Sequence, residues 1–243
     1  MLILNADDFG LDEEATDNIH NCFLNGRITT TTAMLFMLDS ERAAKIALAN
    51  NYEVGLHVNF TELFNSDNIL EAEKNRQKRL VGFFSPNKYN RLLYNPLISN
   101  DVKLCFKAQL EEFVRLYGKF PSHIDGHHHI HLCSNVIIDK VIPSQFAVRR
   151  GVSFEKHERN ILNKAYRNIV NIIVKRRHVC VDKFYVMDSH LLKSGIQHIV
   201  TESKTCNLEL SSHPEKSESY EFLMGADFLR LIESTHLGRY SDL

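Results

Sequence analysis

The stretch Ser122-His-Ile-Asp-Gly-His-His-His-Ile-His131 predicts a short strand that ends in a cluster of histidines. Side chains on a strand alternate between its two faces, so His123, Asp125 and His127 fall on one face. If the extended conformation continues, the last two histidines join them. Gly126 removes a side chain where the backbone needs to bend. Such crowding indicates that the imidazoles hold a divalent metal, although some of them could instead be hydrogen-bonded core histidines.

Similar apolar runs recur along the chain and alternate with segments of helical periodicity. Strands are predicted over residues 2–4, 28–38, 54–60, 122–125, 146–149, 184–187 and 208–212. Helices are predicted over residues 12–24, 40–49 (with Ser40 as N-cap), 101–116, 135–141 and 220–234. Strands separated by helical segments favour βαβ units and a mostly parallel sheet. The predicted fold class is α/β, a (β/α) barrel that is irregular or incomplete (TIM-like), in a single domain over residues 1–243.

Two segments are predicted to be peripheral. Residues 66–100 carry a charged run followed by Gly82, Pro86 and Pro96, which predicts an inserted loop, a candidate lid or substrate wall. Residues 160–177 alternate Ile and Val with Lys and Arg. This pattern is typical of an ordinary surface helix, and it also fits a basic amphipathic helix that touches a membrane or an anionic substrate.

Composition excludes several classes of protein. The 243 residues include 29 Lys and Arg against 30 Asp and Glu, so there is no electrostatic reason to expect a nucleic-acid partner. No apolar run reaches the roughly 18–20 residues that span a bilayer, and the start lacks a basic leader; both favour a cytoplasmic protein without stable membrane insertion. The five cysteines are scattered without a Cys-x-x-Cys pair, so they predict reduced thiols rather than disulfides or a thiolate zinc site.

Asp7 and Asp8 follow the first apolar strand directly. Neighbouring residues on a strand point to opposite sides, but at a strand end the backbone can turn both into one cleft. Two carboxylates close together push their pKa values apart, so one can bind a cation while the other accepts a proton. The alternative is an exposed turn, or an N-cap doublet before the helix at residues 12–24.

Two further histidines end predicted strands. His57 follows Gly55, which allows close approach, and His213 precedes Pro214, which tends to hold it extended. Either could also be a hydrogen-bonded core histidine. One Asp and two His would suit zinc or a similar ion in an open site, where a bound water is acidified and a substrate carbonyl polarised.

The chain resembles the carbohydrate deacetylases of the YdjC/ChbG type, which include hopanoid-associated members. Four stretches carry the likeness: Asn5-Ala-Asp-Asp-Phe-Gly10, Gly55-Leu-His57, Pro121-Ser-His-Ile-Asp-Gly-His-His-His-Ile-His131 and Ser212-His-Pro214. The resemblance implies a (β/α) barrel that removes an N-acetyl group from an amino sugar by hydrolysis. It also implies one divalent metal ion, zinc or magnesium, and, at family level, a homodimer.

The resemblance also implies a role for each matched residue. The metal ligands would be Asp8, His57 and His127. Asp7 would be the general base, and His213 would be the general acid that protonates the departing amine.

Two residues receive supporting roles. Asp125 is predicted to orient a histidine from behind. Arg149 is predicted to bind an anionic part of the substrate, such as a phosphate, or else to be a surface or ion-pair residue.

Two other functions compete with deacetylation. One is a metal-dependent amidohydrolase or phosphoesterase that acts on a non-sugar substrate; no early His-x-His precedes His127, which disfavours an amidohydrolase. The other is a non-catalytic metal or sugar binder, which would need neither Asp7 nor His213.

Overall fold

Eight strands form one sheet in the computed structural model, which describes residues 1–153 and 161–243. They are β1 (Leu2–Phe9), β2 (Thr30–Ala33), β3 (Val54–Val58), β4 (His123–Gly126), β5 (Ala147–Val148), β6 (Lys183–Val186), β7 (Leu208–Ser212) and β8 (Leu237–Gly238). The order is β5-β4-β3-β2-β1-β7-β6, and β8 pairs with β1. Every pairing is parallel. The seven strands of this order curl into a half-barrel, which confirms the predicted incomplete TIM-like fold.

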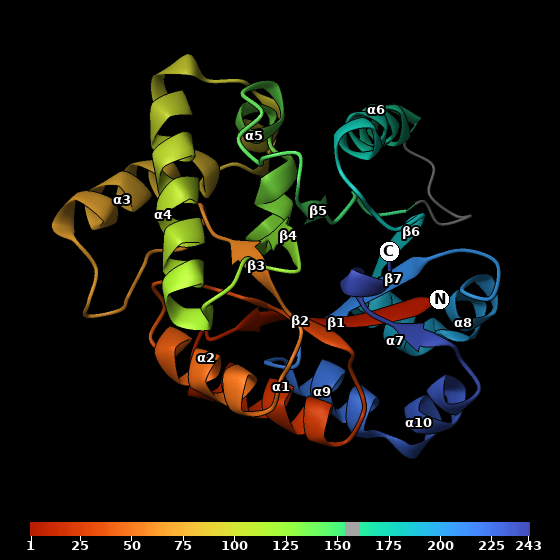
Figure 1. The fold of residues 1–243 in the computed structure, drawn as a ribbon. Helices are drawn as coiled ribbons and strands as arrows, with labels where there is room; N and C mark the ends of the chain where they lie inside the picture. Colours follow the sequence, from red (N-terminus) through yellow and green to blue (C-terminus); the bar gives the residue numbers. More distant parts are fainter. Residues whose placement is uncertain (154–160) are drawn as a thin grey trace.

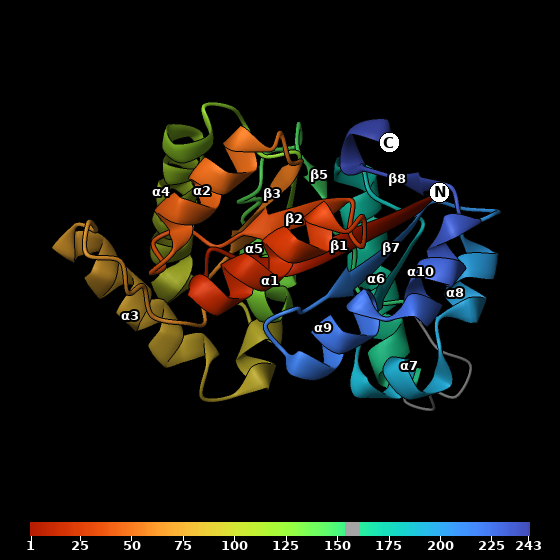
Figure 2. The same cartoon turned by 90° about the horizontal axis from the view of Figure 1, so that it is seen from below.

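The helices cover the outside of this sheet (Figure 1). They are α1 (Glu13–Leu24), α2 (Ser40–Ala49), α3 (Glu71–Phe84), α4 (Ser99–Tyr117), α5 (Ser134–Ile138), α6 (Ile161–Arg177), α7 (Ser189–Ser194), α8 (Gln197–Glu202), α9 (Ser217–Met224) and α10 (Ala226–Glu233). Figure 2 shows α1 in front of β1 and β2, with α2 and α9 on either side of α1. All eight residues of β1 are buried, as expected for a parallel strand with both faces covered.

Local sequence explains where α1 and α2 begin. The helix was predicted from residue 12, but Asp12 is its N-cap: the Asp12 side chain accepts a hydrogen bond from the N–H of Ala15 at 2.8 Å. Ser40 is not the N-cap of α2. Instead it is the first helical residue, and its buried hydroxyl bonds to the loop before it, accepting from the N–H of Met37 at 2.9 Å. The same loop contains Phe36, whose φ of 61° lies in the left-handed region.

Some elements differ from those predicted. The strand predicted over residues 28–38 is limited to β2, since the chain leaves the sheet after Ala33. The helix predicted over residues 220–234 is two helices, α9 and α10, because Gly225 is extended (φ −63°, ψ 149°). The short helices α7 and α8 were not predicted.

The two segments predicted to be peripheral are largely helical. Residues 66–100 contain α3 and the 3₁₀ turns η1 (Lys88–Leu92) and η2 (Pro96–Ile98). α3 packs against α4, and Arg79 and Asp101 link the two helices with an ion pair of 2.7 Å. α6 covers the basic segment, except that Asn160 lies outside the described residues. Among the described helices, none has the length and apolar character needed to cross a membrane.

Candidate metal centre

Three side chains from separate parts of the chain meet at the carboxyl end of the sheet. Asp8 lies near the end of β1, His57 lies in β3, and His127 begins the 3₁₀ segment η3 (His127–Leu132) directly after β4. Asp8 Oδ1 is 3.2 Å from His57 Nε2 and 2.9 Å from His127 Nδ1. The three ligand atoms lie within 4.8 Å of one another. The carboxyl ends of parallel strands thus bring together groups that are 119 residues apart in the chain.

The backbone at the end of β1 explains how both adjacent carboxylates face the same site. The pairing of β1 with β2 is regular to Ala6 and shifts before Phe9. Asp8 has a φ of 70°, in the left-handed region that Asp tolerates better than most residues. The strand's alternation is broken at this point, so Asp7 and Asp8 both face inward, as predicted for a strand end.

The histidine cluster does not continue as an extended ladder. After Gly126 the chain turns into η3, and both His128 and His129 are left-handed, with φ of 53° and 58°. A Cβ at Gly126 would lie 2.9 Å from the backbone nitrogen of His131, so the turn requires glycine there. Of the five histidines, His127 alone joins the three-ligand cluster.

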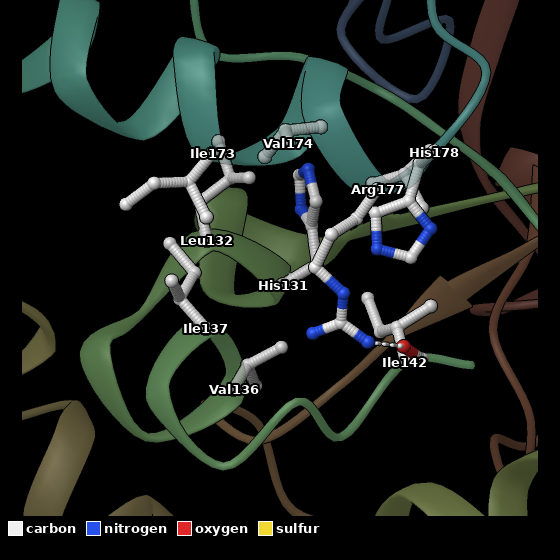
Figure 3. Close-up of a pocket in the computed structure, with 10 residues that line it drawn as sticks. His131, Leu132, Val136, Ile137, Ile142, Ile173, Val174, Arg177 and His178 are labelled. Carbon is white, nitrogen blue, oxygen red and sulfur yellow. Dashed lines mark hydrogen bonds between the residues drawn. The ribbon is translucent and has the colours of Figure 1, made fainter. Parts of the chain in front are cut away.

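Two of the other histidines are buried structural groups. The ring of His123 stacks on Tyr240, with centroids 3.7 Å apart. Nε2 of His131 lies 3.0 Å from the carbonyl oxygen of Arg149. Its ring borders a small cavity of about 30 Å³ between η3, α5 and α6, lined mainly by aliphatic side chains (Figure 3). These two match the alternative of core histidines.

The carboxylates around the cluster stabilise a positive charge on, or between, its histidines. Burial opposes ionisation of Asp8, but His57 and His127 hold its pKa well below the usual range. Burial likewise opposes protonation of His57, yet Asp125 and Asp8 raise its pKa well above normal. Against the same burial, Asp8 and Glu62 raise the pKa of His127 to about 9. A divalent ion would supply the positive charge that the carboxylates attract, and one oxygen with two imidazole nitrogens is a donor set that fits it.

A buried ionic network lies beside the cluster. Arg149 donates from both terminal nitrogens to Asp7, at 2.7 Å each, and also contacts Asp125 at 2.7 Å and Glu209 at 2.6 Å. The hydroxyl of Tyr240 donates to Glu209 in turn. Burial alone would raise the pKa of Asp7, but Arg149 holds it far below normal, so Asp7 is ionised.

A second group of possible ligands, Asp7, His57 and Asp125, overlaps this network. Its two carboxylates are already bridged by the guanidinium of Arg149. A cation there would lie against a fixed positive charge, so the group with Asp8 is the better candidate.

His213 completes the site from the end of β7. Its Nε2 is 3.8 Å from Asp7 Oδ2, and its side chain is 23% exposed. Burial lowers the pKa of His213, and the neighbouring Asp7 acts in the opposite direction. The carboxyl end of the sheet therefore holds a three-ligand cluster with an ionised carboxylate and an imidazole beside it.

The sequence profile of the YdjC-like protein family matches residues 1–226. The chain belongs to the YdjC-like family. This agrees with the resemblance found in the four sequence stretches.

Relatives in the family are named as deacetylases. A carbohydrate deacetylase of Clostridium beijerinckii is 28% identical over 218 residues, which cover 88% of this chain and 80% of that protein. A chitooligosaccharide deacetylase of Yersinia pestis (strain Pestoides F) is 31% identical over 140 residues, 56% of this chain. That second match spans about half of the Yersinia protein, 52%.

A crystal structure from Enterococcus faecalis V583, of a "putative cellobiose-phosphate cleavage protein", has the same fold. Its TM-score is 0.72 at 20% identity, and the match covers 99% of this chain and 97% of that one.

Sequence reasoning placed Arg149 at the substrate. In this YdjC-like protein its side chain is fully buried, and its guanidinium is held by three carboxylates. Direct binding of a substrate anion stays a prediction; the observed contacts favour a positioning role.

Two buried partners of this network were missed. Glu209 interrupts the apolar run Leu208-Glu-Leu210, and a lone charge inside a buried strand is a signal that could have identified it. Tyr240 gave no comparable signal.

Proposed function

We propose that this YdjC-like protein is a metal-dependent hydrolase that removes the N-acetyl group from an amino sugar or oligosaccharide. The observation that carries the proposal is the cluster of Asp8, His57 and His127 with Asp7 and His213 beside it. The names of the relatives, carbohydrate and chitooligosaccharide deacetylase, support the substrate class.

One divalent ion would be held by Asp8, His57 and His127. When bound, it polarises the acetamide carbonyl and acidifies a water. Two imidazole ligands favour zinc, or another transition metal, over magnesium. Asp125 orients one of these ligands: its Oδ1 is 2.7 Å from Nδ1 of His57, which leaves Nε2 facing Asp8.

Asp7 is the general base in this proposal. The two hydrogen bonds from Arg149 fix its carboxylate and keep it ionised, so it is ready to accept a proton. It takes that proton from the water as the water oxygen attacks the acetyl carbon. His213 donates a proton to the amide nitrogen as the C–N bond breaks, and the products are acetate and the free amine. Nε2 of His213 lies 3.8 Å from Oδ2 of Asp7, so the proposed acid and the proposed base face the same reacting amide.

Residues 1–243 are proposed to be a single domain, with 66–100 as an insertion that bounds the substrate cleft. A homodimer remains a prediction.

Acetate release tests the proposal. The full chain, loaded with zinc or magnesium, is offered a panel of N-acetylated mono- and oligosaccharides, free, phosphorylated and lipid-linked. We expect release from at least one of them, and its loss in His57→Ala. Silence across the panel with metal bound would reject deacetylation in favour of an amidohydrolase, a phosphoesterase or a non-catalytic binder.

A further inference from the structure

Glu62 lies on the outer side of His127. Its Oε2 is 3.3 Å from Nε2 of the His127 ring, whose Nδ1 is 2.9 Å from Asp8. The ring therefore lies between two carboxylates, the buried one of Asp8 and the half-exposed one of Glu62. The side chain of Glu62 is 45% exposed. A carboxylate oxygen of Glu62 thus faces the nitrogen that points away from the cluster.

The arrangement repeats, in mirrored form, what Asp125 does at His57. His57 faces Asp8 with Nε2 and Asp125 with Nδ1, at 3.2 Å and 2.7 Å. His127 faces Asp8 with Nδ1 and turns Nε2 outward. An imidazole whose outer nitrogen donates its hydrogen to a carboxylate keeps the lone pair of its inner nitrogen directed at a metal.

The turn that carries Glu62 is held by buried amides. Oδ1 of Asn59 accepts from the backbone N–H groups of Thr61 and Glu62, at 3.0 Å and 2.9 Å. Nε2 of Gln77, on α3, donates to the carbonyl oxygen of Glu62 at 2.7 Å. Oε1 of Gln109, on α4, accepts from the N–H of Asn59 at 2.8 Å.

The exposed fraction of Asn59, Gln77 and Gln109 is 0%, so the amide groups that hold the turn are shielded from water. Although the Glu62 side chain is half-exposed, its backbone is fixed by two helices. The segment 66–100 thus reaches the metal centre through α3.

We propose that Glu62 is a positioning residue for the metal: it selects the His127 tautomer that binds through Nδ1 and strengthens that nitrogen as a ligand. The inference rests on the proposed metal centre and adds a residue to it. Removal of such an outer partner typically lowers metal affinity about 10- to 100-fold.

The test measures zinc affinity of the full chain by competition with a chromophoric chelator. Glu62→Ala removes both the charge and the acceptor, so we expect affinity to fall about 10- to 100-fold. Glu62→Gln keeps an acceptor oxygen and should lose less. The matched control is Glu111→Gln, whose glutamate is 66% exposed and paired with Lys107 on α4; its affinity should equal that of the wild type.

A purely structural role is excluded by two further readouts. Urea unfolding in the presence of a chelator should give the same midpoint for all four proteins. The visible spectrum of the cobalt-substituted protein should shift in Glu62→Ala, because the His127 ligand changes orientation. Wild-type affinity in both Glu62 variants would overturn the inference and leave the metal centre standing. A wild-type chain that binds no zinc or cobalt would overturn the metal centre as well.

Discussion

Asp7 and Asp8 are neighbours in the chain but face different partners. Asp8 contacts two histidines, whereas Asp7 is held by Arg149, and the left-handed backbone at Asp8 is what separates them. Sequence alone predicted that the pair would enter one cleft, since strand ends gather functional groups. It could not predict Arg149 as the partner of Asp7, because that contact joins residues 142 positions apart through the closed fold.

Asp7→Asn tests the role of Asp7 as the base independently of metal binding. Asparagine keeps an oxygen for Arg149 but cannot take a proton, so we expect kcat to fall about 10²- to 10⁴-fold. Zinc affinity should stay close to that of the wild type, since Asp7 is not one of the three proposed ligands. Steady-state acetate release and a zinc titration on the same preparation measure both; unchanged turnover would remove Asp7 as the base.

Glu209 links stability to pH. Burial, aided by nearby Asp125 and against the pull of Arg149, raises its pKa from 4.5 to about 7. Between pH 4.5 and pH 7, Glu209 is protonated in the folded protein and ionised in the unfolded chain. The stability that Glu209 contributes therefore falls as the pH rises from the lower pKa through the higher one. Glutamine cannot ionise, so Glu209→Gln should gain stability relative to the wild type from pH 5 to pH 8, by up to about 3 kcal/mol.

Urea unfolding at the two pH values measures this difference. The histidines titrate in both proteins and cancel in the comparison. Glu111→Gln, on an exposed face of α4, serves as the control and should show no such trend. A Glu209→Gln difference that does not change with pH would contradict the assignment.

At the scale of elements, the close packing of β3 against β4 positions the cluster. His57 pairs in register with Asp125, so the strand pairing itself places the Asp125 carboxylate beside the imidazole of His57. Strand and helix positions followed from apolar periodicity, and most were predicted. The elements that differ from the prediction do so at single residues whose backbone conformation cannot be read from apolar periodicity, such as the extended Gly225 and the left-handed Phe36.

Gly55→Ala tests the packing of β3 on β4. A Cβ at Gly55 would lie 2.6 Å from the ring of His123, which is itself stacked on Tyr240 and has little room to move. We expect a loss of about 1–3 kcal/mol in the free energy of unfolding. Gly82→Ala is the matched control: its Cβ would meet nothing within 4 Å, and alanine in α3 should add about 0.5–1 kcal/mol. Equal effects of the two substitutions would refute the close approach.

At the scale of the whole molecule, the proposed ligands tie three regions of the sheet together. The half-barrel was predictable because strands and helices alternate along the chain, and the ordered motifs placed Asp8, His57 and His127 in one site. How far the sheet closes toward a full barrel was not predictable. The edge strand β5 has only two residues, and its pairing with β4 depends on long-range packing.

Zinc should therefore stabilise the whole chain. An ion that binds only the folded state at 100 times its Kd adds about 2.7 kcal/mol to the free energy of unfolding. Thermal unfolding with zinc and with a chelator should show this gain in the wild type and not in His57→Ala. A gain of the same size in that variant would indicate binding elsewhere.

The central position of β1 has a consequence for the order in which the molecule folds. β1 pairs with β2 on one side and with β7, about two hundred residues later, on the other. Closing so long a loop carries a large entropy cost, and contacts between distant residues slow folding. The ligand side chains all precede residue 128, whereas Arg149 and His213 come later in synthesis. We therefore expect a nascent chain to bring the three proposed ligands together before His213, the proposed acid, and Arg149, which holds the base Asp7, have been synthesised.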